Sequence, residues 1–172
     1  MNNLTISIFG NQIFSEIINE LKLFSKYKVK LYNDLNLCIK EANNTNQLTI
    51  FYISKANQKN YEKLNKIEFP LIIISESSII QNKLFGKFIE RLNKPIRILD
   101  LEKKIISLLS KFKFKKSSLI NLLNYTIDKN ERIIKKNNLK LKLTEKEIYF
   151  LILFSEKKKP LSRDYILKNV WN

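Results

Sequence analysis

Two stretches carry the clearest strand signals in this sequence: Leu-Thr-Ile-Phe-Tyr-Ile-Ser at residues 48–54 and Pro-Leu-Ile-Ile-Ile-Ser at residues 70–75. Both are short, largely apolar and rich in branched or aromatic side chains, which is typical of strands buried on both faces of a sheet. Weaker runs of the same kind occur at residues 4–9, 28–32 and 87–92. The first part of the chain therefore contains five predicted strands.

Stretches with helical spacing alternate with these strands. In residues 12–25 the apolar side chains follow the i, i+3, i+4, i+7 pattern of one helical face, with Phe14, Ile17, Ile18 and Leu21. Further helices are expected at residues 35–42, 57–66, 77–84 and 99–112. This alternation predicts an α/β domain with a five-stranded, parallel, doubly wound sheet. In such a sheet the functional residues follow the carboxyl ends of the strands.

The pattern changes after residue 113. The basic string Lys-Phe-Lys-Phe-Lys-Lys-Ser-Ser at residues 111–118 does not alternate into a core, so we expect a linker over residues 114–122. Short strand-like pieces separated by turn-forming residues follow at residues 123–127, 132–135 and 139–143. Residues 123–172 are thus predicted to form a second, smaller α+β domain.

Two helices are predicted at the end of the sequence. Thr144 followed by Glu147 is the pattern of a capping box, in which hydroxyl and carboxylate each accept a backbone N–H bond. Pro160 lies beyond the end of this helix, and Ser162 is expected to cap the next one.

Three residue counts exclude several kinds of active site. The 172-residue chain contains no His, one Cys and two Gly. Without His there is no Ser-His-Asp triad, and Cys38 alone can form neither an intrachain disulfide nor a thiolate cluster for a metal. Gly10 and Gly86 are too far apart for a glycine-rich phosphate loop. We therefore expect no enzyme, no cofactor and no metal, and we treat Cys38 as an inert buried thiol.

The net charge of +16 is compatible with nucleic-acid binding but does not establish it. Of the 32 basic residues, 28 are Lys. The charge is spread along the chain, with +10 over residues 1–116 and +6 over residues 117–172. A solvated lysine surface, of the kind that an A+T-rich genome encodes, explains the charge equally well.

The sequence contains no predicted membrane segment. Its apolar runs, such as residues 149–154, are far shorter than the roughly 20 residues that cross a bilayer. The N-terminus lacks the basic and long apolar regions of a signal peptide. We expect a cytoplasmic protein.

The second domain carries the most specific motifs. Leu-Lys-Leu-Thr-Glu-Lys-Glu-Ile at residues 141–148 and Leu-Ser-Arg-Asp-Tyr-Ile-Leu-Lys-Asn-Val-Trp at residues 161–171 resemble the first two helices of the winged-helix domain in OmpR/PhoB-type response regulators. The element order of the whole chain resembles the same family. The resemblance implies a CheY/flavodoxin-like receiver (pseudo-receiver) domain over residues 1–113 and the N-terminal part of a winged helix-turn-helix DNA-binding domain over residues 123–172.

The first domain departs from this family where phosphotransfer takes place. The family holds Mg²⁺ with an acidic pair after its first strand, whereas residues 10–12 are Gly-Asn-Gln. The alignment puts Tyr52 at the position of the phosphoacceptor Asp. Ser75, Lys94 and Pro95 match family positions after the fourth and fifth strands. The resemblance thus implies a receiver that is not phosphorylated.

Each of these residues also has a simpler interpretation. Tyr52 lies on an apolar strand, and core packing alone would explain it. Lys94 can be a solvated surface residue, and Ser75 can hold a turn. Pro95 can simply end a strand.

In the second domain the resemblance assigns contacts with the DNA backbone to Ser162, Arg163 and Trp171. The alternatives are an ion pair between Arg163 and Asp164 and a core position for the Trp171 indole. The family's recognition helix and wing follow the Val-Trp motif. We therefore expect a chain that stops at Asn172 to lack base reading and to expose part of the apolar faces of its two helices.

These features predict a DNA-binding transcription regulator of the two-component response-regulator type, which belongs to phosphorelay signal transduction but has a receiver that is not phosphorylated. The expected partners are the DNA backbone and a second subunit, identical or different, bound through the receiver. The alternative is an interaction or dimerisation module that pairs with full-length regulators or another protein without reading DNA.

Overall fold

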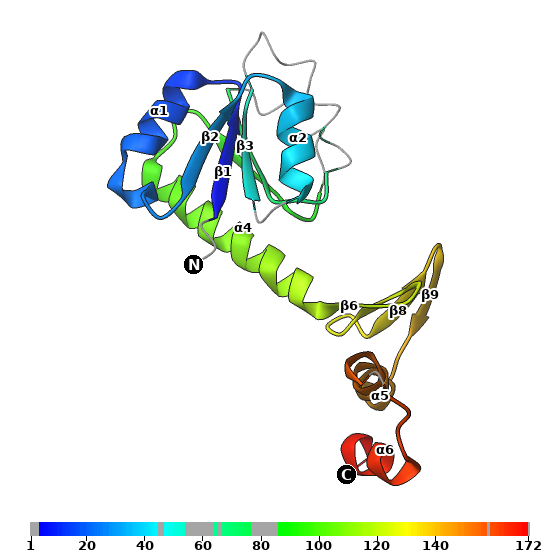
Figure 1. Cartoon of the computed structure of the whole chain (residues 1–172). Coiled ribbons are helices and arrows are strands. Elements are labelled where there is room, and N and C mark those ends of the chain that lie inside the picture. Colours follow the sequence, from blue (N-terminus) through cyan, green and yellow to red (C-terminus); the bar gives the residue numbers. More distant parts are fainter. Residues whose placement is uncertain are drawn as a thin grey trace. The chain divides into compact units, whose positions relative to one another are not determined.

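The computed structural model of the chain describes residues 4–44, 47–53, 64, 67–76, 86–157 and 159–171. The chain divides into two compact units, Met1–Phe112 and Lys113–Asn172. Each unit is built on one sheet (Figure 1).

The first unit contains a five-stranded parallel sheet with the strand order β2-β1-β3-β4-β5. Its strands are β1 (Thr5–Phe9), β2 (Lys28–Tyr32), β3 (Gln47–Tyr52), β4 (Leu71–Ser75) and β5 (Ile89–Asn93). Its helices are α1 (Gln12–Glu20), the short 3-10 helix η1 (Lys22–Phe24), α2 (Leu35–Asn44) and α4 (Ile98–Ser118). This strand order is that of flavodoxin-like and CheY-like sheets, so the predicted fold class is confirmed.

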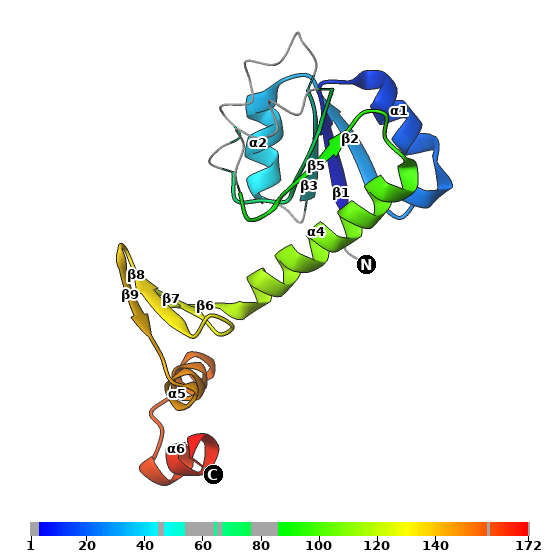
Figure 2. The ribbon, with the colours of Figure 1, turned by 180° about the vertical axis from the view of Figure 1, so that it is seen from behind.

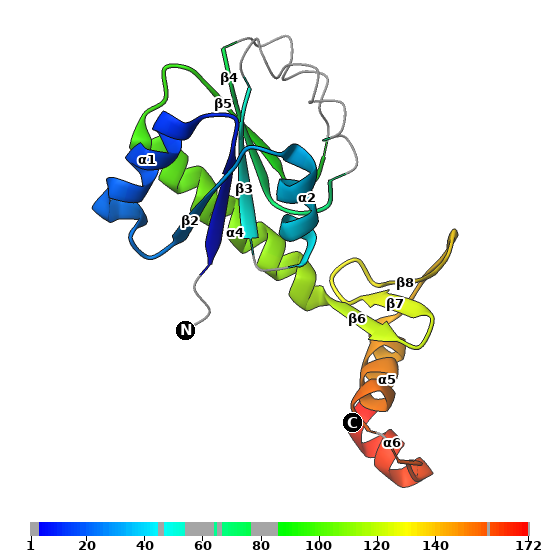
Figure 3. The same cartoon turned by 45° about the horizontal axis from the view of Figure 1, so that its top comes forward.

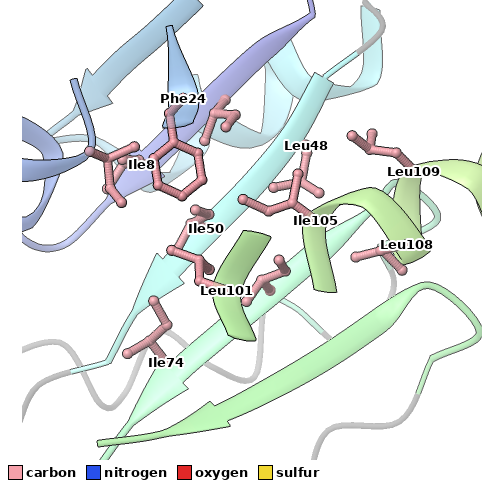
Figure 4. Packing of buried hydrophobic residues seen from close by; sticks show 12 residues of the cluster. Ile8, Phe24, Leu48, Ile50, Ile74, Leu101, Ile105, Leu108 and Leu109 are labelled. Atoms are coloured by element: carbon pink, nitrogen blue, oxygen red, sulfur yellow. The ribbon is translucent and has the colours of Figure 1, made fainter. Parts of the chain in front are cut away.

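Helices cover both faces of this sheet (Figure 3). On one face Ile8 and Ile50 pack with α1 and with α4, which contributes Ile105 (Figure 4). On the other face Phe51 packs with α2, which contributes Cys38. The near-continuous apolar character of the strands follows from this burial on both sides.

All five predicted strands are present, with ends that differ by one or two residues. The helix predicted over residues 12–25 is α1 followed by η1, because Leu21 between them adopts an extended backbone. The helix predicted over residues 77–84 lies outside the described residues. So does nearly all of the helix predicted over residues 57–66.

Helix α4 corrects the predicted linker. It continues to Ser118, so residues 114–118 are helical, and residues 119–122 form a strand, β6. The helix contains no Gly or Pro. Asp100 lies in its first turn, and Lys115 and Lys116 lie in its last, which is the charge arrangement that a helix dipole favours. The lysine-rich string therefore extends the helix by residues whose side chains are largely exposed.

The second unit contains a four-stranded antiparallel sheet in the order β6-β7-β8-β9, followed by two helices (Figure 2). The elements are β6 (Leu119–Leu122), β7 (Tyr125–Asp128), β8 (Ile133–Lys136), β9 (Leu139–Lys142), α5 (Glu145–Glu156) and α6 (Arg163–Val170). This arrangement fits a winged-helix-like part. The strand predicted at residues 123–127 begins only at Tyr125, because Leu123 lies in the turn that joins β6 to β7.

Two neighbouring rows of this sheet, which lie on opposite faces, differ in polarity. One row across the four strands is apolar and consists of Ile120, Ile127, Ile134 and Leu141. The next row points to the opposite face and consists of Asn121, Thr126, Lys135 and Lys140. Because Ile127 is fully buried, the apolar face is the one that contributes to the core of the unit.

Both helix starts predicted in this unit are confirmed. The Thr144 hydroxyl accepts a bond from the Glu147 amide, and the Thr144 amide donates to the Glu147 carboxylate at 2.7 Å. These bonds from Thr144 lower the pKa of Glu147. The Ser162 hydroxyl accepts a bond from the Tyr165 amide at 3.3 Å and caps α6.

The expected exposure of apolar side chains on these helices is found for all but one of them. Phe150, Leu151, Phe154, Ile166 and Trp171 are half-buried or exposed. Val170 belongs to the same apolar faces and was also expected to be exposed, but it is buried. Its carbonyl also accepts a bond from the Lys146 ammonium at 2.8 Å, which ties the end of α6 to α5.

Candidate functional site

Three strands of the first unit end side by side at the carboxyl edge of the sheet. Tyr52 is the last residue of β3, Ser75 the last of β4 and Asn93 the last of β5, with Ser75 paired to Asn93. Lys94 and Pro95 follow β5 directly. The structure therefore gathers at one edge the four receiver-family positions Tyr52, Ser75, Lys94 and Pro95.

The Tyr52 ring lies between an aromatic and a cationic side chain. Its centroid is 5.6 Å from that of Phe14 on α1, and the Lys94 ammonium lies 3.9 Å from the Tyr52 ring centre. The Tyr52 side chain is partly buried and packs against the core that contains α1 and α4. Core packing and a contact at the edge of the sheet are therefore both present at this residue.

Lys94 is held from two sides. Its ammonium forms an ion pair with the Glu76 carboxylate at 3.1 Å, and its amide donates to the Ser75 carbonyl at 3.2 Å. Burial alone would lower the pKa of Lys94, but the bonds to Tyr52 and Glu76 outweigh burial and raise it. The lysine is therefore a fixed cation at this edge and not a freely solvated one. The Lys94–Pro95 peptide bond is cis.

The segment after β1 is occupied with helix capping. The Asn11 side-chain oxygen accepts a bond from the Phe14 amide at 2.7 Å and caps α1. In receivers of the resembling family the carboxylates that hold Mg²⁺ come from this segment, and here it supplies none. Among the residues that the structure describes, no three His, Cys, Asp or Glu side chains are grouped closely enough to hold a metal ion.

Two residues of this site, Glu76 and Phe14, are not marked as site residues by the sequence motifs. Glu76 directly follows Ser75, so its place after a predicted strand was a usable signal. Phe14 was predicted only as part of the apolar face of a helix, and nothing in the sequence marked its contact with Tyr52. Both residues surround the lysine–tyrosine pair without adding metal-binding geometry.

The predicted DNA-contacting residues lie at the two ends of α6. Ser162 caps the helix, Arg163 is its first residue and is exposed, and Trp171 follows its last residue. No carboxylate of the described residues pairs with Arg163, so the alternative ion pair with Asp164 is not formed. Ser162 and Arg163 are thus brought together, whereas Trp171 lies at the opposite end of the helix.

The Trp171 side chain does not fill a core position. It is 52% exposed, and its ring centre lies 6.2 Å from that of Phe150 on α5 in an edge-on arrangement. The buried position at this end of α6 is occupied by Val170 instead.

The Cys38 thiol is enclosed in the first unit. Its side chain is fully buried against α2 and the sheet, and burial raises its pKa to about 12. A thiol that keeps its proton at neutral pH is a poor nucleophile, as expected for a packing residue.

Comparisons with solved structures place the fold among response regulators. A mutant of the protein RitR aligns with a TM-score of 0.55 at 19% identity, over 99% of this chain and 81% of that chain. A structure described as a novel family of redox sensors in the streptococci, evolved from two-component response regulators, aligns with a TM-score of 0.52 at 20% identity, over 98% and 81%. A response regulator receiver protein from Sinorhizobium medicae WSM419 aligns with a TM-score of 0.53 at 13% identity, over 64% and 98%.

The first unit therefore has the receiver fold, and the antiparallel sheet and helices of the second unit fit a winged-helix-like part. No family model and no curated protein matches the chain. None of the described helices is both long and apolar enough to cross a bilayer.

Proposed function

We propose that this protein is a DNA-binding transcription regulator of the response-regulator type whose receiver unit works without aspartyl phosphorylation. The observation that carries the proposal is the contact between Tyr52 and Lys94. The resemblance puts these two residues at the positions of the family's phosphoacceptor Asp and of the Lys that follows its fifth strand. The receiver fold followed by a winged-helix-like unit supports the general kind of protein.

The side chains at the C-terminal ends of the strands do not allow an acyl phosphate to form. An acyl phosphate requires a carboxylate, and the phenol of Tyr52 cannot form one. Phosphoryl transfer to a receiver also requires Mg²⁺ bound by oxygen ligands close to the acceptor. The Lys94 ammonium, which would otherwise meet the phosphoryl group, is already paired with Glu76.

The rest of the proposal concerns partners. DNA would be bound through its backbone by Ser162, Arg163 and Trp171, and the receiver unit would pair with a second subunit. The protein would act in the cytoplasm without cofactor, metal or catalytic activity. The exposed position of Arg163 at a capped helix start supports its part in this assignment, because guanidinium and free amides both favour a phosphate.

The second candidate function is an interaction module that does not read DNA. It is favoured by the exposed aromatic side chains of α5 and α6, of which Phe154 is 39% and Trp171 is 52% exposed. An apolar surface of this kind marks a contact site for another protein.

A redox role, which the description of one structural neighbour suggests for that protein, finds little support here. The chain contains a single cysteine, Cys38, and its thiol is buried and protonated at neutral pH. Redox-sensing thiols are accessible and have a low pKa.

Phosphorylation is tested by incubating the full chain with acetyl phosphate and Mg²⁺ and measuring its intact mass. We expect no mass increase, while a receiver that has the acidic residues gains one phosphoryl group under the same conditions. A base-labile mass increase would overturn the first half of the proposal.

DNA reading is tested by selection from a pool of random duplexes at about 0.2 M salt, where non-specific binding is weak. Because the proposed contacts are with the DNA backbone, we expect duplex binding that weakens steeply with salt and enriches no motif. Failure to bind any duplex even at low salt would favour the interaction module, and enrichment of one recurring motif would show that the chain also reads bases.

A further inference from the structure

The face of the β6–β9 sheet opposite Ile127 carries a group of three lysines, together with the apolar residues Leu119 and Ile133. Lys135 on β8 lies directly opposite Lys140 on β9, and Lys142 lies two residues further along β9 on the same face. Opposed residues in an antiparallel pair have Cα atoms about 5 Å apart, and residues i and i+2 of a strand are about 7 Å apart. Three ammonium groups therefore share one small surface, called here the lysine face.

The lysine face contains no acid that would neutralise it. No described carboxylate pairs with Lys135, Lys140 or Lys142, and the ion pairs of this unit involve Lys115 and Arg132 instead. The one carboxylate on this side of the sheet is Asp128, which is buried and already bonded to Lys115 and Ser118. Like charges placed directly opposite each other destabilise a sheet, so the arrangement has a cost that a bound anion would remove.

Neutral donors continue the same row across the sheet. Across the sheet, Lys135 lies directly opposite Thr126 on β7, and Thr126 lies directly opposite Asn121 on β6. The Thr126 hydroxyl donates to the side-chain oxygen of Asn121 at 3.3 Å. The side-chain nitrogen of Asn121 donates to no described residue. Lys, Thr and Asn side chains are the groups that contact phosphate and sugar in protein–DNA complexes.

We propose that the lysine face binds the phosphate backbone of duplex DNA. The proposal rests on the proposed DNA-binding function and adds a contact surface distinct from α6. Lysines on an edge strand also discourage pairing with other sheets, and this accounts for Lys140 and Lys142 on β9. It does not account for Lys135, because β8 lies between β7 and β9 and has no free edge.

The test measures the binding of the full chain to a fluorescein-labelled duplex of mixed sequence over a range of salt concentrations. The test variant replaces Lys135, Lys140 and Lys142 by Gln. The control variant replaces Lys22, Lys40 and Lys103, which are exposed, by Gln and so removes the same charge from the first unit. A third variant with Arg at the three positions of the lysine face keeps the charge.

Each phosphate contact contributes about 0.9 to the slope of log K against log salt, so loss of three contacts reduces the slope by about 2.7. At about 0.1 M salt this corresponds to a loss of affinity on the order of a hundredfold. We expect this change for the Gln variant of the lysine face, a small change for the control variant and wild-type behaviour for the Arg variant. Circular dichroism confirms that each variant is folded.

An equal loss in the test and control variants would overturn the proposal, because it would assign the effect to total charge. An unchanged slope in the test variant would also overturn it and leave the proposed DNA binding intact. If the wild-type chain binds no duplex at any salt concentration, the proposed function fails as well. Binding of polyglutamate but not of DNA, abolished in the test variant, would assign the face to an acidic protein instead.

Discussion

The Lys94 ammonium lies 3.9 Å from the centre of the Tyr52 ring, so the last residue of β3 and the first residue after β5 are joined by a cation–π contact. Such contacts contribute about 0.5–1 kcal/mol. In a double-mutant cycle with Tyr52→Leu and Lys94→Met we expect a coupling energy in this range, measured by urea unfolding followed by circular dichroism.

The matched control for this cycle is Tyr52→Phe, which keeps the ring. Coupling to Lys94 that persists in this variant assigns the interaction to the ring, whereas coupling lost with the hydroxyl alone assigns it to a hydrogen bond. Zero coupling in the Leu cycle would mean that the contact between Lys94 and the Tyr52 ring contributes nothing to stability.

The buried carboxylate of Asp128 is expected to be the most sensitive polar group of the second unit. Burial alone would raise the pKa of Asp128, but bonds from Lys115, the Glu131 amide and Ser118 outweigh burial and lower it. Removal of a buried charge that has a partner costs about 3 kcal/mol. We expect a loss of this size for Asp128→Ala, measured in urea by the fluorescence of Trp171, the single Trp.

The same group predicts an acid dependence. Because its folded-state pKa is below the unfolded value of about 3.9, its contribution is present above pH 4 and is lost as the pH falls through the folded-state pKa. The wild-type unit should therefore lose more stability below pH 4 than Asp128→Ala does. Glu131→Gln is the control, since this exposed partner of Lys115 should contribute less than about 1 kcal/mol.

Leu123 is expected to be a site of easy stabilisation. It has a φ of 52° in the turn between β6 and β7, and its side chain is 93% exposed. The left-handed conformation costs an ordinary side chain about 1–2 kcal/mol, and Asn tolerates it better than Leu. Leu123→Asn should raise the free energy of unfolding by about 1 kcal/mol.

The control for this substitution is Leu139→Asn, since Leu139 is also exposed but lies in a regular strand. An equal gain at Leu139 would show that loss of exposed apolar surface, and not relief of the turn, is the cause.

The Cys38 thiol is expected to resist alkylation in the folded protein. Its pKa of about 12 leaves almost no thiolate at pH 8, and the side chain is fully buried. Iodoacetamide should modify it only in urea, whereas Leu37→Cys in a Cys38→Ala background, at an exposed position of the same helix, should react in buffer. Because the unfolded thiol ionises near pH 9 and the folded one does not, stability should also fall above that pH.

Much of the fold could be predicted because its signals are local. The strands Leu71–Ser75 and Gln47–Tyr52 are nearly unbroken apolar runs, and the capping box at Thr144 is complete within four residues. The strand β6 could not be found in this way. Apolar and polar residues alternate only weakly in β6, and it becomes a strand through pairing with β7. The turn between the two strands contains Leu123, where a turn signal would be Gly or Asn.

The candidate site was predictable only in part, for a similar reason. The resemblance pointed to Tyr52 and Lys94, but their contact depends on the path of β3 and β5 in space. The sequence placed Glu76 directly after a predicted strand, but its pairing with Lys94 follows only from the end of β4 lying beside the end of β5. Distances between separate strands are a property of the sheet and cannot be read from residue spacing.

The difference in polarity between the two faces of the β6–β9 sheet also makes its pairing intolerant of slippage. A shift of β9 by one residue against β8 would move Lys140 and Lys142 to the apolar face and bring Leu141 to the other. The two-residue turn at Asn137 and Asn138, where Asn137 has a φ of 53°, sets this pairing. This turn therefore determines on which face the lysines of β9 lie. One residue inserted into the turn would move every side chain of β9 to the opposite face.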